Sequence, residues 1–383
     1  RITPFGTFSA DQAGAGSDSN LIDYVLLPRG IFSEDSRELR AVDGTSFALD
    51  YGNGRTVRID LGGCGLLSPS ESLDCRALRR SRMSAYANLR EGLRRGRAGV
   101  ADEAVESFDA AERDARSARD PILLELVHRW RGMTLLLHGN AREGAAVLAE
   151  LVRVSENALE IADDAGRELH KAGRLPEAAA WYSRALERAG PEHTGRSVTY
   201  PREGLLLAFA ELGRWEEASR WVDRWSAAAS TRVVARVPWY RAFLAWRQGI
   251  AFDPPELTLG TYDLLHLWWY EMLLARNAEP KPLLEQARAE FVEAVRARGP
   301  LLSVQAELLD RLGRREEARA VAREAWRETE AAVRTEVWTR AHLDLVVERV
   351  VRLAGGDEAR HARALLATVR AEAKRPDPGT RTR

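Results

Sequence analysis

The chain has no excess of charge of either sign. Its 57 basic residues are balanced by 57 acidic residues, which gives a formal net charge of +0 at pH 7. Because the two signs are interspersed along the sequence, no strong field draws the protein to nucleic acid or to anionic lipid. Lysine is scarce: only Lys171, Lys281 and Lys374 occur, and arginine supplies the other positive charges. We interpret this bias as codon usage in a GC-rich genome and not as phosphate recognition.

Long apolar runs are also missing. No run reaches the ~18 residues that a membrane-spanning helix needs, so we expect no direct membrane insertion of this segment. No signal peptide is visible, yet the chain begins with Arg1, which leads us to expect that something preceded it. A signal peptide, a membrane anchor or an arbitrary boundary would each give this start. Among the locations that remain, we favour a periplasmic or extracytoplasmic one over the cytoplasm.

Cysteine is limited to Cys64 and Cys75, eleven positions apart in a turn-rich stretch. Their spacing fits no common zinc site. An isolated close pair in irregular backbone is compatible with a disulfide in an oxidising compartment, where closing so short a loop adds roughly 3 kcal/mol of stability. Two unrelated reduced thiols explain the same pair equally well, and both interpretations stay open.

Catalytic motifs are absent from the sequence. It contains no GxxxxGKS/T phosphate loop, no GxSxG nucleophile elbow, no HExxH and no CxxC. No two histidines are four residues apart, and we interpret His266, in an apolar run, as a core residue. Asp163 and Asp164 are adjacent, but successive helical residues point about 100° apart, so these carboxylates do not converge. The sequence therefore predicts a protein that is not an enzyme and that uses no metal and no cofactor.

The chain divides into three parts. Residues 1–80 form a small amino-terminal segment, in which 47–51 and 56–59 flank a Gly-Asn-Gly turn and predict a β-hairpin. From about residue 81 to 373, apolar residues recur at helical spacing between regular glycine or proline breaks, which predicts a series of antiparallel helix pairs. Residues 374–383 are expected to be a disordered tail.

One spacing pattern recurs around the turn glycines of the helical part. Around Gly173, small residues lie seven positions before and five and twelve after, and a large residue lies nine after; these are Gly166, Ala178, Ala185 and Tyr182. Small or apolar residues occupy the same offsets around four other glycines, namely Gly99, Gly139, Gly213 and Gly313. Small residues at fixed places let two helices approach closely, so the pattern predicts repeated helix–turn–helix units that stack on their neighbours.

This register resembles the tetratricopeptide repeat family, a 34-residue helix–turn–helix unit with small residues at its eighth and twentieth positions. Residues 125–158 and 159–192 follow one another in 34-residue phase, and 199–232 continues the pattern. Residues 299–332 match less closely, and the proline-containing stretch at 252–260 interrupts the series. The resemblance implies a mostly α fold, in which about seven helix pairs form a right-handed superhelical solenoid.

The family binds its partners on a concave face lined by the first helix of each unit. Carried over by register, the resemblance implies that this face includes Trp130, Met133, Asp163, Arg167, His170, Tyr200, Glu203 and Leu207. Leucines at 89 and 93 stand where chaperone-binding members carry their carboxylate clamp, so chaperone tails are not expected partners. A basic track for RNA is missing as well. The aromatic residues around Trp268 are either buried between helices or part of a second partner pocket.

We therefore expect a non-enzymatic scaffold that binds a protein or a peptide, in a bacterial-type envelope assembly or a cytoplasmic one. The alternative is that the chain is the soluble carboxy-terminal repeat domain of a larger membrane-bound enzyme, such as a transferase, whose catalytic part lies before Arg1. Several hydrophobic spans upstream would favour the alternative, whereas a short signal peptide would favour the scaffold.

The disulfide hypothesis can be tested directly. If Cys64 and Cys75 are bonded, peptide mapping without reductant will recover their two peptides as one cross-linked species that separates on reduction. Recovery of both cysteines as alkylated free thiols would establish the other interpretation.

Overall fold

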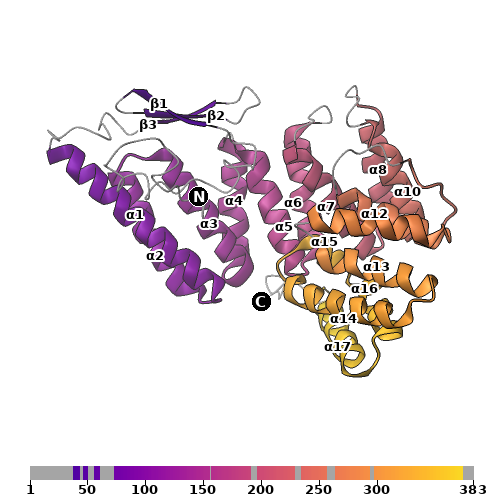
Figure 1. Ribbon diagram of the computed structural model, residues 1–383. Coiled ribbons are helices and arrows are strands. Elements are labelled where there is room, and N and C mark those ends of the chain that lie inside the picture. Colours follow the sequence, from indigo (N-terminus) through magenta and orange to yellow (C-terminus); the bar gives the residue numbers. More distant parts are fainter. Residues whose placement is uncertain are drawn as a thin grey trace, which may run out of the picture. The chain divides into compact units, whose positions relative to one another are not determined.

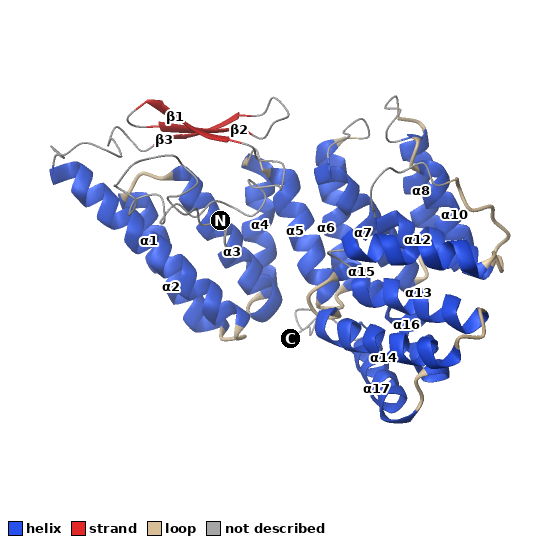
Figure 2. Cartoon of the chain, viewed as in Figure 1, coloured by secondary structure: helices blue, strands red, loops and turns tan. Residues whose placement is uncertain are grey.

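We describe the fold from a computed structural model of the chain. The structure describes residues 38–43, 46–50, 56–60, 73–155, 157–190, 196–228, 234–256, 264–293 and 297–373. The described chain is mostly α-helical, and consecutive helices pack as neighbouring pairs (Figures 1 and 2). It forms two compact units, Arg1–Ala158 and Leu159–Arg383. Their boundary coincides with the boundary between the two best-matching repeats.

The first unit contains three short strands and four long helices. Strands β1 (Glu38–Asp43), β2 (Ser46–Asp50) and β3 (Thr56–Asp60) pair antiparallel in that order, with Asp50 opposite Thr56. The Gly-Asn-Gly turn and residues 1–37 lie outside the described residues, so a folded β-containing segment over residues 1–80 stays a prediction. The predicted tail at 374–383 lies outside them too.

The helices of the first unit form two antiparallel pairs. These are α1 (Leu73–Arg97) with α2 (Ala101–Ser117), and α3 (Pro121–His138) with α4 (Ala141–Val154). Helix α1 begins about two turns before the predicted start of the helical part. The added stretch contains neither glycine nor proline and so has no helix breaker. Asp120 caps α3 by accepting a hydrogen bond from the backbone N–H of Leu123.

The second unit continues with further helices. They are α5 (Ala158–Lys171), α6 (Leu175–Ala189), α7 (Arg196–Leu212), α8 (Trp215–Ser226), α10 (Val237–Arg247), α11 (Leu264–Ala275), α12 (Pro280–Glu293), α13 (Arg298–Arg311), α14 (Arg315–Ala332), α15 (Val337–Ala341), α16 (Leu343–Leu353) and α17 (Gly356–Ala373). No helix or strand is assigned to residues 251–256, where Pro254 and Pro255 follow α10. The repeat is therefore interrupted where the sequence predicts the break.

The same left-handed glycine turn ends the first helix of several pairs. After α5, Gly173 adopts φ +78°, the N–H of Arg174 donates to the carbonyl of Leu169, and the N–H of Gly173 donates to that of His170. This is a Schellman cap, which satisfies carbonyls that the helix end leaves open. Equivalent turns follow α1, α7, α10 and α13, at Gly99, Gly213, Gly249 and Gly313. Glycine is favoured at these positions because a Cβ is unfavourable at positive φ.

The predicted small-residue positions are places where helices touch. A Cβ built on Gly166 of α5 would lie 2.6 Å from Tyr182 Cδ1 of α6, and one on Gly204 of α7 would lie 2.6 Å from Tyr182 Cζ. The Tyr182 ring is thus held between two glycines and is fully buried. In the first unit, Gly92 meets the Phe108 ring in the same way, with a built Cβ 2.7 Å from Cε1. The Tyr182 ring of α6 therefore fills the space that glycines leave on α5 and on α7.

The second unit departs from a series with nearest-neighbour contacts only. Helix α15 contacts α7, and α16 contacts α13 and α14; Figure 1 shows α15 lying beside α7. Arg340 of α15 donates from Nη1 to the carbonyl of Lys171, at a distance of 3.2 Å across 169 residues. The expectation that contacts stay between adjacent units is therefore wrong for this part of the chain. These distant contacts form because the last helices bury aromatic and charged side chains against α5, α7, α10 and α11.

No helix among the described residues combines the length and apolarity that a membrane span requires.

The glycine at the α5–α6 crossing gives a stability prediction. Gly166→Leu places a branched side chain where the Tyr182 ring already lies, so we expect a loss of roughly 1 to 3 kcal/mol or more in the free energy of unfolding. Thermal unfolding followed by circular dichroism measures it. The matched control is Ala180→Leu, at an exposed position of α6, which should leave the melting temperature nearly unchanged. An unchanged melting temperature for Gly166→Leu would contradict the close crossing.

Candidate partner-binding site

The residues predicted for partner binding lie on three first helices. Trp130 and Met133 are on α3 in the first unit; Asp163, Arg167 and His170 are on α5, and Tyr200, Glu203 and Leu207 are on α7, in the second. Five of them are buried, namely Met133, Asp163, His170, Glu203 and Leu207. Trp130, Arg167 and Tyr200 are partly exposed. Of the eight predicted residues, these three are the ones whose side chains a partner can reach in this structure.

The charges of α5 are neutralised within the helix. Arg167 Nε lies 3.3 Å from Asp163 Oδ2, and Arg167 also pairs with Asp164, one turn away. Burial opposes the charge of Arg167, but Asp163, together with the nearby Tyr182 and Tyr200, raises the pKa of its guanidinium. The charge of Arg167 is therefore stabilised chiefly by carboxylates of its own helix.

The side chain of His170 is paired with Glu211, which is not among the residues that the sequence predicts for binding. Its Nε2 lies 2.7 Å from Oε1 of Glu211, near the end of α7, and its ring packs edge-on against Tyr182 at 6.1 Å. Burial alone would raise the pKa of Glu211, but His170, with Arg340 and Arg247, outweighs it and holds that pKa below its usual value. His170 thus ties α5 to α7 and does not face solvent.

Arg340 of α15 and Arg247 of α10 complete this polar region. Arg340, which is 3% exposed, donates to the carbonyl of Lys171, the last residue of α5, where a positive charge complements the helix dipole. Arg247 Nη2 of α10 lies 3.5 Å from Oδ2 of Asp344 on α16. Glu203 has a separate partner, because its Oε1 accepts from Arg236 Nη1 at 3.0 Å. The carboxyl ends of α5, α7 and α10 are therefore linked to α15 and α16 by charged groups.

A second buried network fixes α16. Arg349 Nη1 donates to Glu271 Oε1 of α11 at 2.7 Å and to Ser303 Oγ of α13 at 3.0 Å, and its other terminal nitrogen pairs with Oε2 of Glu271. Burial opposes the charge, but Glu271 raises the pKa of Arg349. A pocket of about 240 Å³ adjoins this network and includes Trp246. Since Glu271 and Arg349 satisfy each other, the network leaves neither charge open for a ligand.

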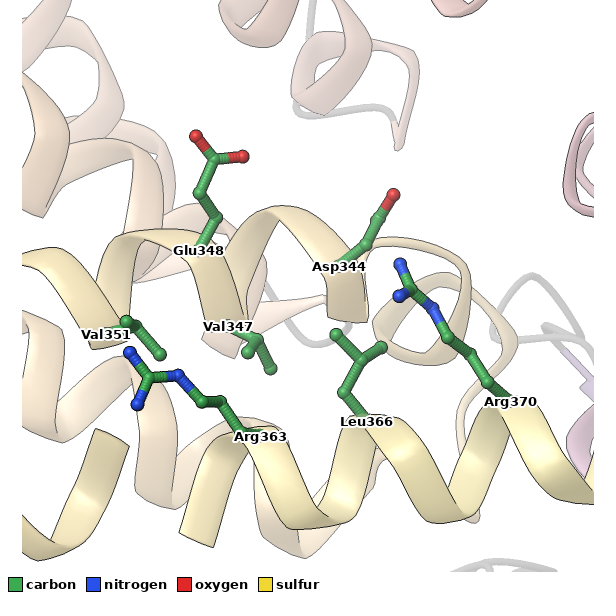
Figure 3. Close-up of a pocket in the computed structure, with 7 residues that line it drawn as sticks. All are labelled: Asp344, Val347, Glu348, Val351, Arg363, Leu366 and Arg370. Carbon is green, nitrogen blue, oxygen red and sulfur yellow. The ribbon is translucent and has the colours of Figure 1, made fainter. Parts of the chain in front are cut away.

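A larger pocket, of about 400 Å³, lies between α16 and α17 (Figure 3). Val347, Val351 and Leu366 supply its apolar part. Its charged lining residues are Asp344 and Glu348 from α16, and Arg363 and Arg370 from α17. In Figure 3 Leu366 points toward α16 between the two arginines, which lie to either side of it along α17. The sequence analysis assigned no role to any of these residues.

The aromatic stretch of α11 is part of the core. Trp268 and Tyr270 are fully buried, and Trp268 stacks on Phe243 at 3.8 Å between ring centroids and meets Trp338 at 5.1 Å. The neighbouring Trp269 is partly exposed and donates from Nε1 to the carbonyl of Pro255 at 3.1 Å. Of the two interpretations for this stretch, burial between helices is the one that the structure supports for Trp268 and Tyr270.

Some of the missed residues carry a signal in the sequence. Glu271 lies in the run LWWYEMLL, and Arg349 follows Glu348 in VVERVV, so each is a charge in a largely apolar stretch. A buried charge requires a partner of opposite sign, and an inventory of such positions would have matched the two. Glu211 and Arg340 carry no such signal, because the partner of Glu211 lies on α5 and that of Arg340 depends on how the last helices fold back.

Cys64 and the side chain of Cys75 lie outside the described residues, so the disulfide stays a prediction. Among the residues whose side chains the structure describes, no group of three or more His, Cys, Asp or Glu side chains is arranged to hold a metal ion.

The His170–Glu211 pair predicts a pH-dependent contribution to stability. Because the pKa of Glu211 is lowered on folding, its ionised form stabilises the fold above the unfolded-state pKa, and this contribution is lost as pH falls through the folded-state value. We expect Glu211→Gln to lower the free energy of unfolding at pH 7 by about 1–3 kcal/mol. The deficit should shrink as the pH falls below about 4.

Urea unfolding at a series of pH values measures this difference. Glu216→Gln, at an exposed position on α8, is the matched control and should behave like the wild type throughout. A deficit for Glu211→Gln that stays constant from neutral to acidic pH would contradict the charged pair.

Comparison of the chain with protein-family models, with curated proteins and with solved structures finds no match.

Proposed function

We propose that the protein is a non-enzymatic interaction scaffold of tetratricopeptide type, which binds a protein or a peptide on the first helices of its repeats. The observation that carries the proposal is the recurrence of one helix-pair geometry, with the same glycine turn after α1, α5, α7, α10 and α13. Stacked repeats of this kind present extended surfaces, and such surfaces are what repeat proteins use for binding. A right-handed superhelical path belongs to this proposal.

The exposed part of the predicted face suggests how a partner is held. Trp130 packs against the core of the first unit while keeping part of its indole accessible. A partly exposed tryptophan combines a large apolar area with an N–H donor, and such side chains dominate binding energy when a partner desolvates them. Tyr200 has the same character in the second unit. Arg167, whose charge is already paired with Asp163 and Asp164, offers its exposed N–H donors to orient the partner.

A protein partner fits the electrostatics better than a polyanion does. Arginines and carboxylates alternate along the helices and pair one turn apart, as in Arg94 with Glu91, Arg153 with Glu150 and Arg314 with Glu317. A phosphate backbone would require an uninterrupted row of positive charge. The mixed pattern is suited to a partner that also carries both signs.

The test is truncation of the proposed anchor. Trp130→Ala should weaken capture of the partner by at least about 1 kcal/mol, which is roughly five-fold in Kd, and leave the helical content unchanged. The partner is first recovered by cross-linking to the immobilised full chain, and its affinity is then measured with purified protein.

Trp221→Ala is the matched control for this experiment. Trp221 is a partly exposed tryptophan on α8, a second helix of its pair, so its loss should not affect capture. If Trp130→Ala unfolds the chain, or if both variants bind the partner as the wild type does, the first helices are not the binding face.

A further inference from the structure

We propose that the pocket between α16 and α17 is a docking groove for an acidic amphipathic helix of a partner protein. The inference rests on the proposed scaffold function and gives it a second contact surface with defined chemistry. The occupant carries an apolar stripe, with a carboxylate at each end of it, two helical turns apart.

The floor of the groove is apolar and firmly held. Val347 belongs to the buried core of the carboxy-terminal helices, and Val351 and Leu366 pack against that core while keeping part of their surface accessible. A partner that covers these side chains removes apolar surface from water, which favours binding by about 25 cal/mol for each Å². An amphipathic helix is the usual segment that lays such a stripe into a groove.

The arginines on α17 give the groove its selectivity. Arg363 and Arg370 are exposed, line the pocket, and form no ion pair with any residue in the described part of the chain. The sequence explains this, because the residues three and four positions away from each within the described helix include no carboxylate. By contrast, Arg360 on the same helix is paired with Asp357. The two guanidinium groups are thus available to a partner.

The spacing of these arginines specifies the partner. They are seven residues apart on one helix, a rise of about 10 Å along its axis. A partner helix that lies along α17 presents carboxylates at the same spacing when they too are seven residues apart, with apolar residues three and four positions after the first.

The two carboxylates of α16 that line the groove, Asp344 and Glu348, do not prevent an acidic helix from binding beside α17. Asp344 already lies 3.5 Å from Arg247 Nη2, and Glu348 points away from Leu366 in Figure 3. An acidic face turned toward α17 therefore meets the arginines first, while the side toward α16 tolerates a basic or neutral residue.

The experiment uses two labelled helical peptides of about 20 residues. Both carry the same leucine stripe; one has glutamates seven residues apart beside it and the other has lysines at those positions. Fluorescence anisotropy with the full chain should show the glutamate peptide binding about ten-fold more tightly, with affinity falling as salt rises. The double variant Arg363→Glu/Arg370→Glu should reverse the preference.

A second double variant controls for net charge. Arg90→Glu/Arg142→Glu changes exposed arginines of α1 and α4 and should keep the preference of the wild type, and circular dichroism should show that both variants fold. Equal binding of the two peptides, no binding of either, or a preference that survives Arg363→Glu/Arg370→Glu would overturn the inference. Tighter binding of a single-stranded RNA that the same double variant abolishes would overturn it in favour of nucleic acid.

The outcome is separable from that of the proposed function. Trp130 lies in the first unit and Arg363 and Arg370 lie in the second, so failure of the peptide experiment leaves the anchor experiment unaffected. Loss of the anchor with an intact peptide preference would instead remove the first-helix surface and retain the groove.

Discussion

The close contact between a glycine and a large ring is the constraint on which the α1–α2 and α5–α6 pairs depend. Where Gly166 and Gly204 meet Tyr182, and where Gly92 meets Phe108, a Cβ would lie within 3 Å of the ring. Such spacing sets how near two helices come, and nearness decides which neighbouring side chains are buried. The fixed places of the small residues in the sequence therefore reflect packing, and the proposed binding surface is what remains on the outside of these crossings.

Buried charge performs the second task, which is to close the far end of the second unit. Arg349 and Glu271 lie on helices far apart in the sequence, and each would be costly to bury alone. Together they fix which helices α16 meets, and Arg340 adds a contact at the carboxyl end of α5. Helix pairing alone leaves the order of distant elements open, whereas a matched pair of buried charges is satisfied in one arrangement.

The helix pairs and their turns could be predicted because they depend on local spacing. Gly173, Ala178 and Tyr182 lie within ten residues and predict the α5–α6 crossing. The break at Pro254 is predicted because proline has no backbone N–H to donate. The fold-back of α15 and α16 could not be predicted, since it joins residues as distant as Lys171 and Arg340. The register located the first helices correctly, but it could not tell that His170 would be covered by Glu211, a residue of α7 in the next helix pair.

The groove between α16 and α17 follows from the same buried network. Helix α16 turns Arg349 toward Glu271 and Ser303, and because residues at helical spacing occupy fixed directions around the axis, this orientation determines where Val347 and Val351 point. Helix α17 then packs along the apolar side and leaves Arg363 and Arg370 at the rim. The position of the apolar floor below the accessible arginines is thus set by largely buried charges, and a selective contact requires such rigid support.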